Sequence, residues 1–348
     1  MRRVLNFVIL FSLVISFVSC KQKGRGLMTP TSSALPYEVL VVIPNDLKQT
    51  KAGLLLKEIL TSDVPGLPQS ESAFKIMETD PAHFDGILKP IRNIIIVDID
   101  KTQYTKASMT SQKDLYAYPQ SVLTLKAPDS NSLVDYLELN RVSIVQYFTN
   151  AEMNRQMAIY EKNPNNMASG LVREMFGSDV WLSGELKSVK KGENFLWLGT
   201  AGGGDVNQYY VMYSVPYVDN DSFTREYFIH KRDSVMSINI PGESEGMYMM
   251  TDADFTEFKP ISLRGQYALE ARGLWKMKND FMGGPFVSHM RLDTENKRLV
   301  FTEIFVYAPE KMKRNYVRSM EASLYTVRLP QDLKADSQVT LNNGIDEK

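Results

Sequence analysis

The residues best equipped for chemistry lie in one short stretch that runs from Arg272 to His289. It combines the guanidinium of Arg272 and the imidazole of His289 with three further groups. These are the indole of Trp275, the amide of Asn279 and the carboxylate of Asp280. A cation, a carboxylate and a histidine that converge in a fold can bind an anion or perform general acid–base catalysis. The stretch is therefore a candidate functional surface.

Strand-like sequence flanks this stretch, and a Gly-Gly-Pro sequence indicates a turn between its two strands. Alternation places His289 on the polar face of the second strand. In the following strand-like segment Glu303 falls among apolar side chains, where a carboxylate needs a cation such as Arg272. One hypothesis makes Arg272 an anion clamp, Asp280 the group that orients the base, His289 the base and Glu303 the acid. The other makes these charges a solvated or paired sheet face.

A basic stripe is predicted on the last helix. Lys311, Arg314 and Arg318 recur at a spacing that places them on one helical face. Such a stripe could bind phosphate or peptidoglycan anions, and it is also typical of a solvated face. We include Arg314 and Arg318 in the candidate binding surface.

A second candidate site is the sequence Asn93-Ile-Ile-Ile-Val-Asp98-Ile-Asp100-Lys-Thr102, which resembles the first element of haloacid-dehalogenase-type phosphatases. In that family the first carboxylate attacks phosphorus and the second handles the proton, beside Mg²⁺. Asp252 and Asp254 could supply a later acidic pair. However, no convincing lysine element follows, and acidic residues after a strand are common turn formers. A magnesium-dependent phosphatase is therefore the alternative function.

Composition restricts the partners and cofactors. Lys plus Arg number 40 and Asp plus Glu number 41, so no basic field favours nucleic acid. The three histidines are widely separated, and no zinc-binding motif surrounds them. We therefore predict no metal and no cofactor, apart from Mg²⁺ in the phosphatase alternative, and no nucleic-acid partner.

The amino terminus resembles a bacterial lipoprotein signal. Arg2-Arg3 precede an apolar run that is too short to span a membrane comfortably, and the run ends near Cys20, the single cysteine. We predict a signal peptide over residues 1–19, with cleavage before Cys20 and lipidation at its sulfur by an acyl group such as palmitate and at its new amino terminus. Residues 20–36, rich in Gly, Ser, Thr and Pro, are predicted to be a lipidated tether.

The residues after Cys20 also indicate the location of the mature protein. Lys21-Gln22-Lys23 follow the cysteine in place of the aspartate that opposes outer-membrane delivery in such lipoproteins, and no acidic surface-export run is present. We predict a protein attached by lipid to the outer membrane, on the periplasmic face in preference to the cell surface.

The remaining chain is predicted to contain two domains. Residues 37–162 alternate strand-like and helix-like segments and predict an α/β domain, which ends in a long helix. Residues 167–330 contain several strand-like segments and two helices, which predict an α+β domain with an antiparallel sheet covered by helices. Residues 331–348 are predicted to be a polar tail.

Several short motifs together resemble a domain-of-unknown-function family of Bacteroidetes-type lipoproteins. They are Phe195-Leu-Trp-Leu198, Arg232-Asp-Ser-Val235, Ile240-Pro-Gly242, Arg272-Gly-Leu-Trp275, Met282-Gly-Gly-Pro-Phe-Val-Ser288, Val306-Tyr-Ala-Pro309 and Lys313-Arg-Asn-Tyr-Val-Arg318, continued through Glu321-Ala322. The resemblance implies an uncharacterised envelope lipoprotein and carries no catalytic residues. We therefore predict a non-enzymatic binding or assembly module in the cell envelope, whose partner is an envelope protein or a glycan.

Overall fold

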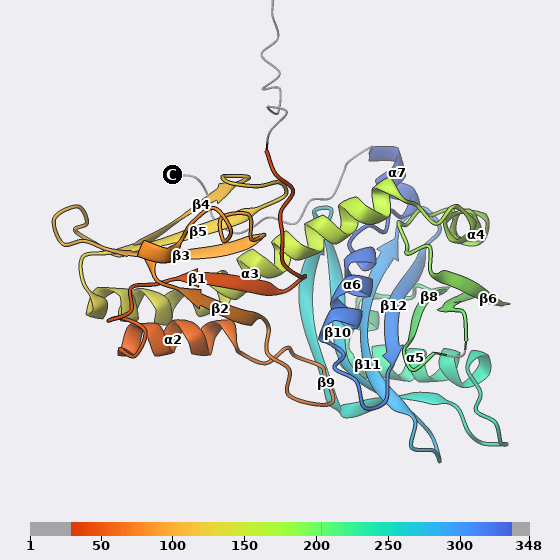
Figure 1. Ribbon diagram of the computed structural model, residues 1–348. Coiled ribbons are helices and arrows are strands. Elements are labelled where there is room, and N and C mark those ends of the chain that lie inside the picture. The colour runs from red at the N-terminus through yellow and green to blue at the C-terminus, as the bar shows by residue number, and fades with distance from the viewer. Residues whose placement is uncertain (1–28, 203, 336–348) are drawn as a thin grey trace, which may run out of the picture.

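The computed structural model describes residues 29–202 and 204–335. The predicted signal peptide, Cys20 and the start of the predicted tether lie outside the described residues. The described chain forms an α/β first part and a second part with a seven-stranded antiparallel sheet, and the long helix α3 runs between them (Figure 1). The predicted succession of an α/β region and an antiparallel sheet with helices is confirmed.

The first part is built on a five-stranded sheet with the order β2-β1-β3-β5-β4. β2, β1, β3 and β5 are parallel, and β4 runs antiparallel to β5 at one edge. Its elements are β1 (Glu38–Val42), α2 (Lys51–Leu60), β2 (Lys75–Thr79), the 3-10 helix η2 (Pro81–His83), β3 (Asn93–Ile99), β4 (Ser108–Lys113), β5 (Ser121–Ala127) and α3 (Ser130–Lys162).

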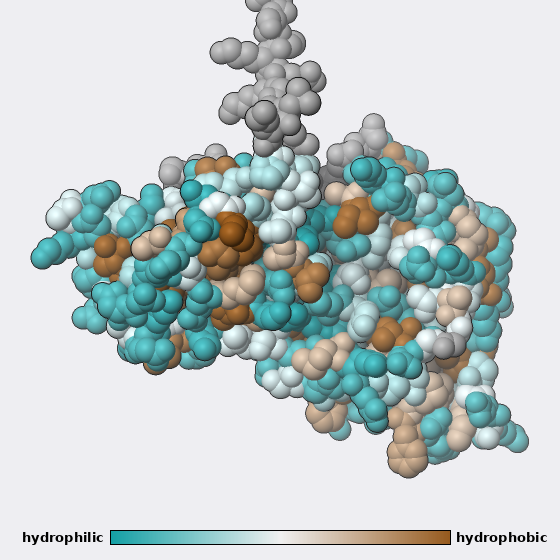
Figure 2. Space-filling model, in the orientation of Figure 1, coloured by the Kyte–Doolittle hydropathy of each residue, from teal (hydrophilic) through white to brown (hydrophobic). Residues whose placement is uncertain are grey.

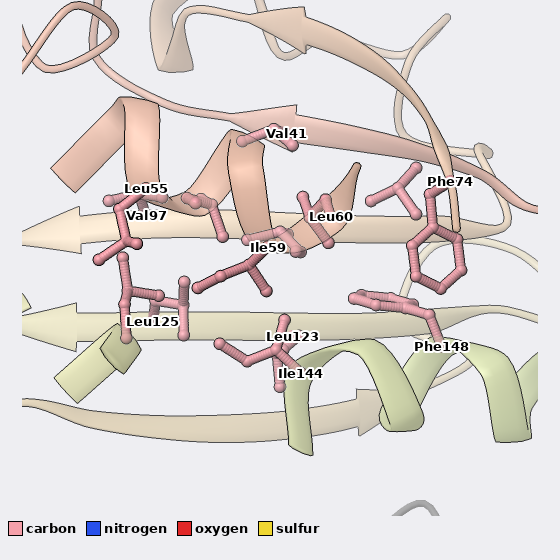
Figure 3. Close-up of a cluster of buried hydrophobic side chains, with 14 of the residues drawn as sticks. Val41, Leu55, Ile59, Leu60, Phe74, Val97, Leu123, Leu125, Ile144 and Phe148 are labelled. Carbon is pink, nitrogen blue, oxygen red and sulfur yellow. The ribbon is translucent and has the colours of Figure 1, made fainter. Parts of the chain in front are cut away.

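α2 and α3 cover the same face of this sheet. Leu55 and Ile59 of α2 meet Val97 and Leu125 of the strands, and Phe148 of α3 closes the same cluster (Figure 3). The apolar residues of α2 recur at helical spacing, so its inward face is continuous. Each buried side chain of this size stabilises the fold by about 1.5–3 kcal/mol, which makes this layer the core of the first part.

The second part is a sheet with the order β6-β7-β8-β12-β11-β10-β9, in which every neighbouring pair is antiparallel. Its elements are α4 (Asn166–Phe176), β6 (Leu186–Gly192), β7 (Phe195–Thr200), β8 (Asn207–Pro216), the 3-10 helix η3 (Asn220–Phe223), α5 (Arg225–Asn239), β9 (Met249–Leu263), β10 (Gln266–Met277), β11 (Gly283–Asp293), β12 (Arg298–Tyr307), α6 (Arg314–Leu324) and α7 (Pro330–Ala335).

Helices cover both faces of the seven-stranded sheet. α5 packs Phe228 and Met236 on one face, in a cluster with Phe301 of β12. α4 and α6 pack on the other face, where Met320 of α6 belongs to a cluster with Val300 of β12. Because successive residues of a strand point to opposite faces, each strand supplies side chains to both layers.

Polar contacts fasten the two parts together at the start of α6. The buried Glu71 carboxylate of the first part accepts hydrogen bonds from the backbone N–H groups of Lys313 and Arg314, at 2.6 and 2.8 Å. This carboxylate satisfies donors that the first turn of a helix leaves unpaired. Tyr160 of α3 donates to the backbone oxygen of Ser319 at 3.0 Å. The second half of α3 thus packs on the second part.

The loop after α2 also reaches the second sheet. Leu67 packs against the cores of both parts. Gly66 has φ +75°, and a Cβ atom there would lie 2.5 Å from Cγ of Arg272. Glycine is required at this position because it supplies both the left-handed backbone and the close approach to β10.

The ends of the described chain differ from the prediction. Ser32 and Ser33 donate backbone hydrogen bonds to the carbonyl groups of Tyr118 and Pro90, so the last residues of the predicted tether belong to the fold. α7 occupies the start of the predicted polar tail, where the buried Asp332 carboxylate binds Arg291 at 2.8 Å. Both predictions relied on local polarity, which does not show that a polar segment has partners elsewhere in the fold.

The predicted Gly-Gly-Pro turn is wrong. Gly283 and Gly284 lie in β11, paired with Lys276 and Trp275, and the hairpin turns at residues 278–282. Asn279 adopts φ 61° in that turn. A Cβ atom at Gly284 would lie 2.1 Å from the carbonyl oxygen of Val306, so this glycine permits a close approach between strands.

Exposed apolar residues are scattered among hydrophilic ones on the face shown in Figure 2. Over the whole described surface, the exposed large apolar side chains include Ile87, Leu139 and Val142. Among the described residues, no helix is both long enough and apolar enough to span a membrane.

Candidate functional site

A hollow of about 390 Å³ lies between the two parts, and we call it the seam pocket. One wall comes from α2, the loop after it and the middle of α3, and the other from β9, β10 and α6. Its lining residues are Ile59, Ser62, Asp63, Pro65, Arg141, Val142, Val145, Gln146, Thr149, Met153, Lys259, Glu270, Arg272, Arg318, Glu321 and Tyr325. Pockets between domains that gather a few polar groups are common ligand sites.

Arg272 is the central cation of this pocket. β10 places it and Glu270 on the same face, and α6 brings Glu321 onto its guanidinium, which donates to that carboxylate through both terminal nitrogens. Burial alone would lower the pKa of Arg272, but Glu321 and Glu270 outweigh burial and raise it. Arg272 therefore stays charged, and its fork geometry fixes Glu321.

Glu270 is held by donors on several sides. Lys259 and Arg272 lie 3.5 and 3.7 Å from its carboxylate, and His289 Nε2 lies 3.2 Å away. The Tyr325 hydroxyl donates to it at 3.4 Å. Burial would raise the pKa of Glu270, but the hydrogen bond with His289 and the charge of Arg272 outweigh burial and lower it. A carboxylate with a lowered pKa is a weak general base, so this arrangement suits recognition better than proton abstraction.

Tyr325 contributes a hydroxyl that stays protonated. Burial raises its pKa well above the ordinary value, and the nearby Glu270 and Glu321 carboxylates add to the shift. The phenol can therefore act as a hydrogen-bond donor throughout the physiological pH range.

His289 lies behind Glu270 and is fully buried, with its ring edge against Tyr325 at 5.0 Å between centroids. Its Nδ1 has no hydrogen-bond partner among the described residues. The imidazole does not line the seam pocket. The structure places His289 and Arg272 on the same sheet face, but it makes His289 a positioning group for Glu270 and not the predicted base in a cleft.

The charges that a ligand can reach are mainly positive. Four cations and three carboxylates line the pocket, and the side chains of Glu270 and Glu321 are only 3% and 1% exposed. Lys259, by contrast, is 65% exposed at its side chain. Arg141 is more confined, since Glu58 and Glu138 bind it at 2.8 and 2.6 Å. An anion that approaches the pocket therefore meets the exposed Lys259, and Asp63 is the exposed carboxylate of the same lining.

Glu303 lies on the opposite face of the sheet, which contradicts its predicted place beside Arg272. Ser288 pairs with Glu303, whereas Val287 pairs with Arg272, and directly paired residues share a face. The cation that Glu303 meets is Arg232 of α5, whose Nη2 donates to it at 2.7 Å. Both side chains are fully buried.

Three other candidates lie outside the seam pocket. Asn279 and Asp280 occupy the turn between β10 and β11, where Asp280 accepts a hydrogen bond from the backbone N–H of Phe281. Trp275 points to the α5 face, where it is buried in the apolar cluster. The structure does not bring Asp280 to Arg272 or His289, so the predicted four-residue constellation is wrong.

The predicted basic stripe is divided between two places. Arg318 lines the seam pocket, and its Nη1 lies 3.3 Å from Glu321. Arg314 lies in a second hollow at the junction, of about 720 Å³, where it donates to the carbonyl of Ser72 at 2.6 Å. Burial lowers the pKa of Arg314, and Glu71 opposes this effect. These two arginines face the first part, whereas Lys311 precedes α6, is exposed and lies 3.3 Å from Asp205, so the three residues do not form one helical stripe.

Asp98 lies near the end of β3, the central strand of the first sheet, and Asp100 directly follows that strand, but both are engaged locally. Asp98 accepts a hydrogen bond from the Tyr104 hydroxyl. Asp100 accepts hydrogen bonds from the hydroxyl and N–H of Thr102, which lower its pKa. Among the described residues, no group of three or more His, Cys, Asp or Glu side chains could hold a metal ion.

The suggested later acidic pair lies in the other sheet. Asp252 belongs to β9, where Lys276 lies 3.4 Å from its carboxylate. Asp254 follows in the same strand. Neither carboxylate therefore lies at the end of β3. Sequence order alone did not show that both belong to the second part.

Sequence analysis did not select Glu270, Glu321 or Tyr325 as site residues. Glu270 could have been found, since it alternates with Arg272 on one face of a strand. Glu321 and Tyr325 follow Arg318 at spacings of three and seven on the same helical side, which is the signal that could have found them.

Two family models match the chain. Residues 165–326 match Domain of unknown function (DUF4837), and residues 32–161 match Domain of unknown function (DUF8532). The predicted resemblance to a family of unknown function is confirmed. A comparison with curated proteins finds no match.

Proposed function

We propose that this chain, which carries two domains of unknown function, is a lipid-anchored cell-envelope protein that acts by binding a small anionic ligand in the seam pocket. The observation that carries the proposal is the charge arrangement of the pocket, in which the exposed Lys259 lies beside buried Glu270 while Arg272 pairs with buried Glu321. The ligand would carry a carboxylate or a phosphate group. Arg318 and the Tyr325 hydroxyl are among the further donors that line the pocket.

Binding is favoured over catalysis because the pocket's acidic groups are already occupied. Glu270 is held by Lys259, Arg272, His289 and Tyr325, and its lowered pKa disfavours proton uptake. Such a network holds the donors rigidly before a ligand arrives, which reduces the entropy cost of binding.

The binding site is tested with a thermal-shift screen of citrate, inorganic phosphate and an acidic tripeptide, followed by calorimetric titration of each probe. We expect at least one probe to raise the melting temperature of the wild-type protein, since ligands stabilise the state that they bind. Lys259→Glu and Val142→Trp should abolish the response, because the first reverses the reachable charge and the second fills the pocket with a bulky ring.

The matched control is Lys101→Glu, which reverses an exposed charge in the first part away from the pocket. It should respond like the wild type. Equal responses in all three variants, or no response to any probe, would contradict a seam-pocket site. Magnesium-dependent phosphate-ester hydrolysis that is lost in Asp98→Asn would replace the binding function with the phosphatase alternative.

The anchor is tested separately with Cys20→Ala. We expect the variant to leave the membrane fraction, because the proposed lipids are attached at this residue. Membrane pelleting of the variant in high salt would contradict the lipid anchor without affecting the seam-pocket proposal.

A further inference from the structure

A third hollow, separate from the seam pocket and from the hollow at Arg314, lies on the α5 face of the seven-stranded sheet. Its volume is about 240 Å³, and we call it the aromatic hollow. It lies between the strands and the segment that follows α5. Its lining residues are Lys190, Trp197, Tyr209, Asn239, Ile240, Pro241, Met249, Trp275, Met277, Met282, Phe305 and Tyr307.

The rings of this hollow form one continuous run across the sheet. Tyr209 stacks on Phe305 with centroids 4.5 Å apart, and Trp197 lies 5.2 Å from Tyr209. Trp275 meets Phe305 edge-on at 5.6 Å and lies 6.3 Å from Tyr307. Trp197, Tyr209 and Tyr307 are only partly buried, so the rings offer surface to a ligand.

Two glycines make room for these rings. A Cβ atom at Gly199 would lie 2.6 Å from the Trp197 ring and 2.9 Å from the Tyr209 ring. A Cβ atom at Gly284 would lie 3.1 Å from Nε1 of Trp275, which donates to the Val306 carbonyl at 3.3 Å. The Gly-Gly-Pro sequence thus keeps the Trp275 indole in place beneath the hollow, although it forms no turn.

The hollow also contains unused hydrogen-bonding capacity. Among the described residues, neither the Tyr209 nor the Tyr307 hydroxyl has a protein hydrogen-bond partner, and neither is sealed from solvent. Burial raises the pKa of Tyr209, and the neighbouring Tyr307 phenol adds to the shift, so its hydroxyl remains a donor. At the rim, the Lys190 ammonium donates to the Asn239 carbonyl at 2.7 Å.

We propose that the aromatic hollow binds one or two sugar rings of a neutral glycan. The C–H bonds on one face of a pyranose carry partial positive charge and suit the negative face of an aromatic ring. The sugar hydroxyls can pair with the Tyr209 and Tyr307 phenols. An acyl chain would cover these phenols without pairing them, which costs free energy. The combination of aromatic walls with a few polar groups is typical of sites that orient a ligand.

The test uses tryptophan fluorescence, because two of the three tryptophans line this hollow. The fluorescence experiment uses the Trp181→Phe variant, so that the remaining emission comes from Trp197 and Trp275. The probes are a trimer of β-1,4-linked N-acetylglucosamine, maltotriose and decanoate below its micelle concentration. We expect one saccharide to shift the emission with saturation, and decanoate to leave it unchanged.

Two variants locate the binding. Trp197→Ala should weaken saccharide binding about tenfold, the size expected for loss of one stacking partner, as measured by calorimetry in the otherwise native chain. Tyr307→Phe keeps the ring and removes only the hydroxyl, so it should fold normally and weaken binding by a smaller factor. Tyr267→Ala, an exposed aromatic elsewhere on the sheet, should bind like the wild type.

Three outcomes would overturn the proposal. One is a saccharide Kd weaker than about 10 mM for both sugars, which is too weak for specific recognition. Another is saturable binding of decanoate in place of the sugars. The third is saccharide binding that is unchanged in both Trp197→Ala and Tyr307→Phe. None of these results depends on Lys259, so they test the aromatic hollow independently of the seam-pocket proposal.

Discussion

The seven-stranded sheet buries an arginine–glutamate pair on each face, and the two pairs differ in what surrounds them. On the α5 face, Arg232 and Glu303 are fully buried and lie against Thr251 and the Phe286 ring. On the α6 face, Arg272 and Glu321 border the seam pocket. The first pair only holds α5 to the sheet, whereas the second also presents charge to a hollow. Similar ion pairs therefore have different roles because only one borders the junction.

The largest effect is expected on the α5 face. Arg232→Ala leaves the Glu303 carboxylate buried and unpaired, so the free energy of unfolding should fall by about 3–5 kcal/mol. Urea unfolding at neutral pH measures this loss of unfolding free energy. The double variant Arg232→Met/Glu303→Leu is the control and should recover most of the loss, since it removes both charges. A loss below about 1 kcal/mol in Arg232→Ala would show that water reaches this pair.

Arg272→Ala should cost less, about 2–3 kcal/mol, although it also leaves buried carboxylates. Arg318 remains near Glu321, and Lys259 and His289 remain near Glu270, so the charges keep partial compensation. The same urea titration gives the comparison. A loss as large as that of Arg232→Ala would remove the distinction between the sealed pair and the pocket pair.

The pH dependence of stability should report Glu270. Its pKa is lowered in the folded state, so it stabilises the fold above its unfolded pKa and loses that contribution as the pH falls. The difference in unfolding free energy between the wild type and Glu270→Gln should be constant near neutral pH. It should shrink below a pH of about 4.3, the ordinary glutamate value. A difference that grows on acidification would contradict the lowered pKa.

Lys259→Ala should have the smallest effect on stability, within about 0.5 kcal/mol, because the side chain is mostly exposed. Its effect on anion binding should nevertheless be large. Thermal unfolding in the absence and presence of citrate separates the two quantities. If stability and the citrate response fall together, Lys259 has a structural role and does not define a binding surface.

Sequence alone could predict the α/β and antiparallel layers, the long helix α3 and the placement of His289 opposite the apolar face of its strand, because periodicity determines which side chains point together. It could not predict that Glu303 meets Arg232, since this pairing depends on α5 packing across the sheet. It also could not predict the seam pocket, whose walls come from segments far apart in the chain, such as Val142 and Lys259. The turn predicted at Gly284 was wrong because glycine is required both in tight turns and where two strands approach closely, and Gly284 serves the second purpose.

Hydrogen exchange, measured segment by segment with and without the anionic probe that gives the largest thermal shift, tests the seam pocket most directly. We predict slower exchange in the middle of α3, in the Lys259 segment of β9, in β10 and in α6, with no change in β7 and β8. Protection confined to β7 and β8, or protection that persists in Lys259→Glu, would contradict the seam pocket as the binding site.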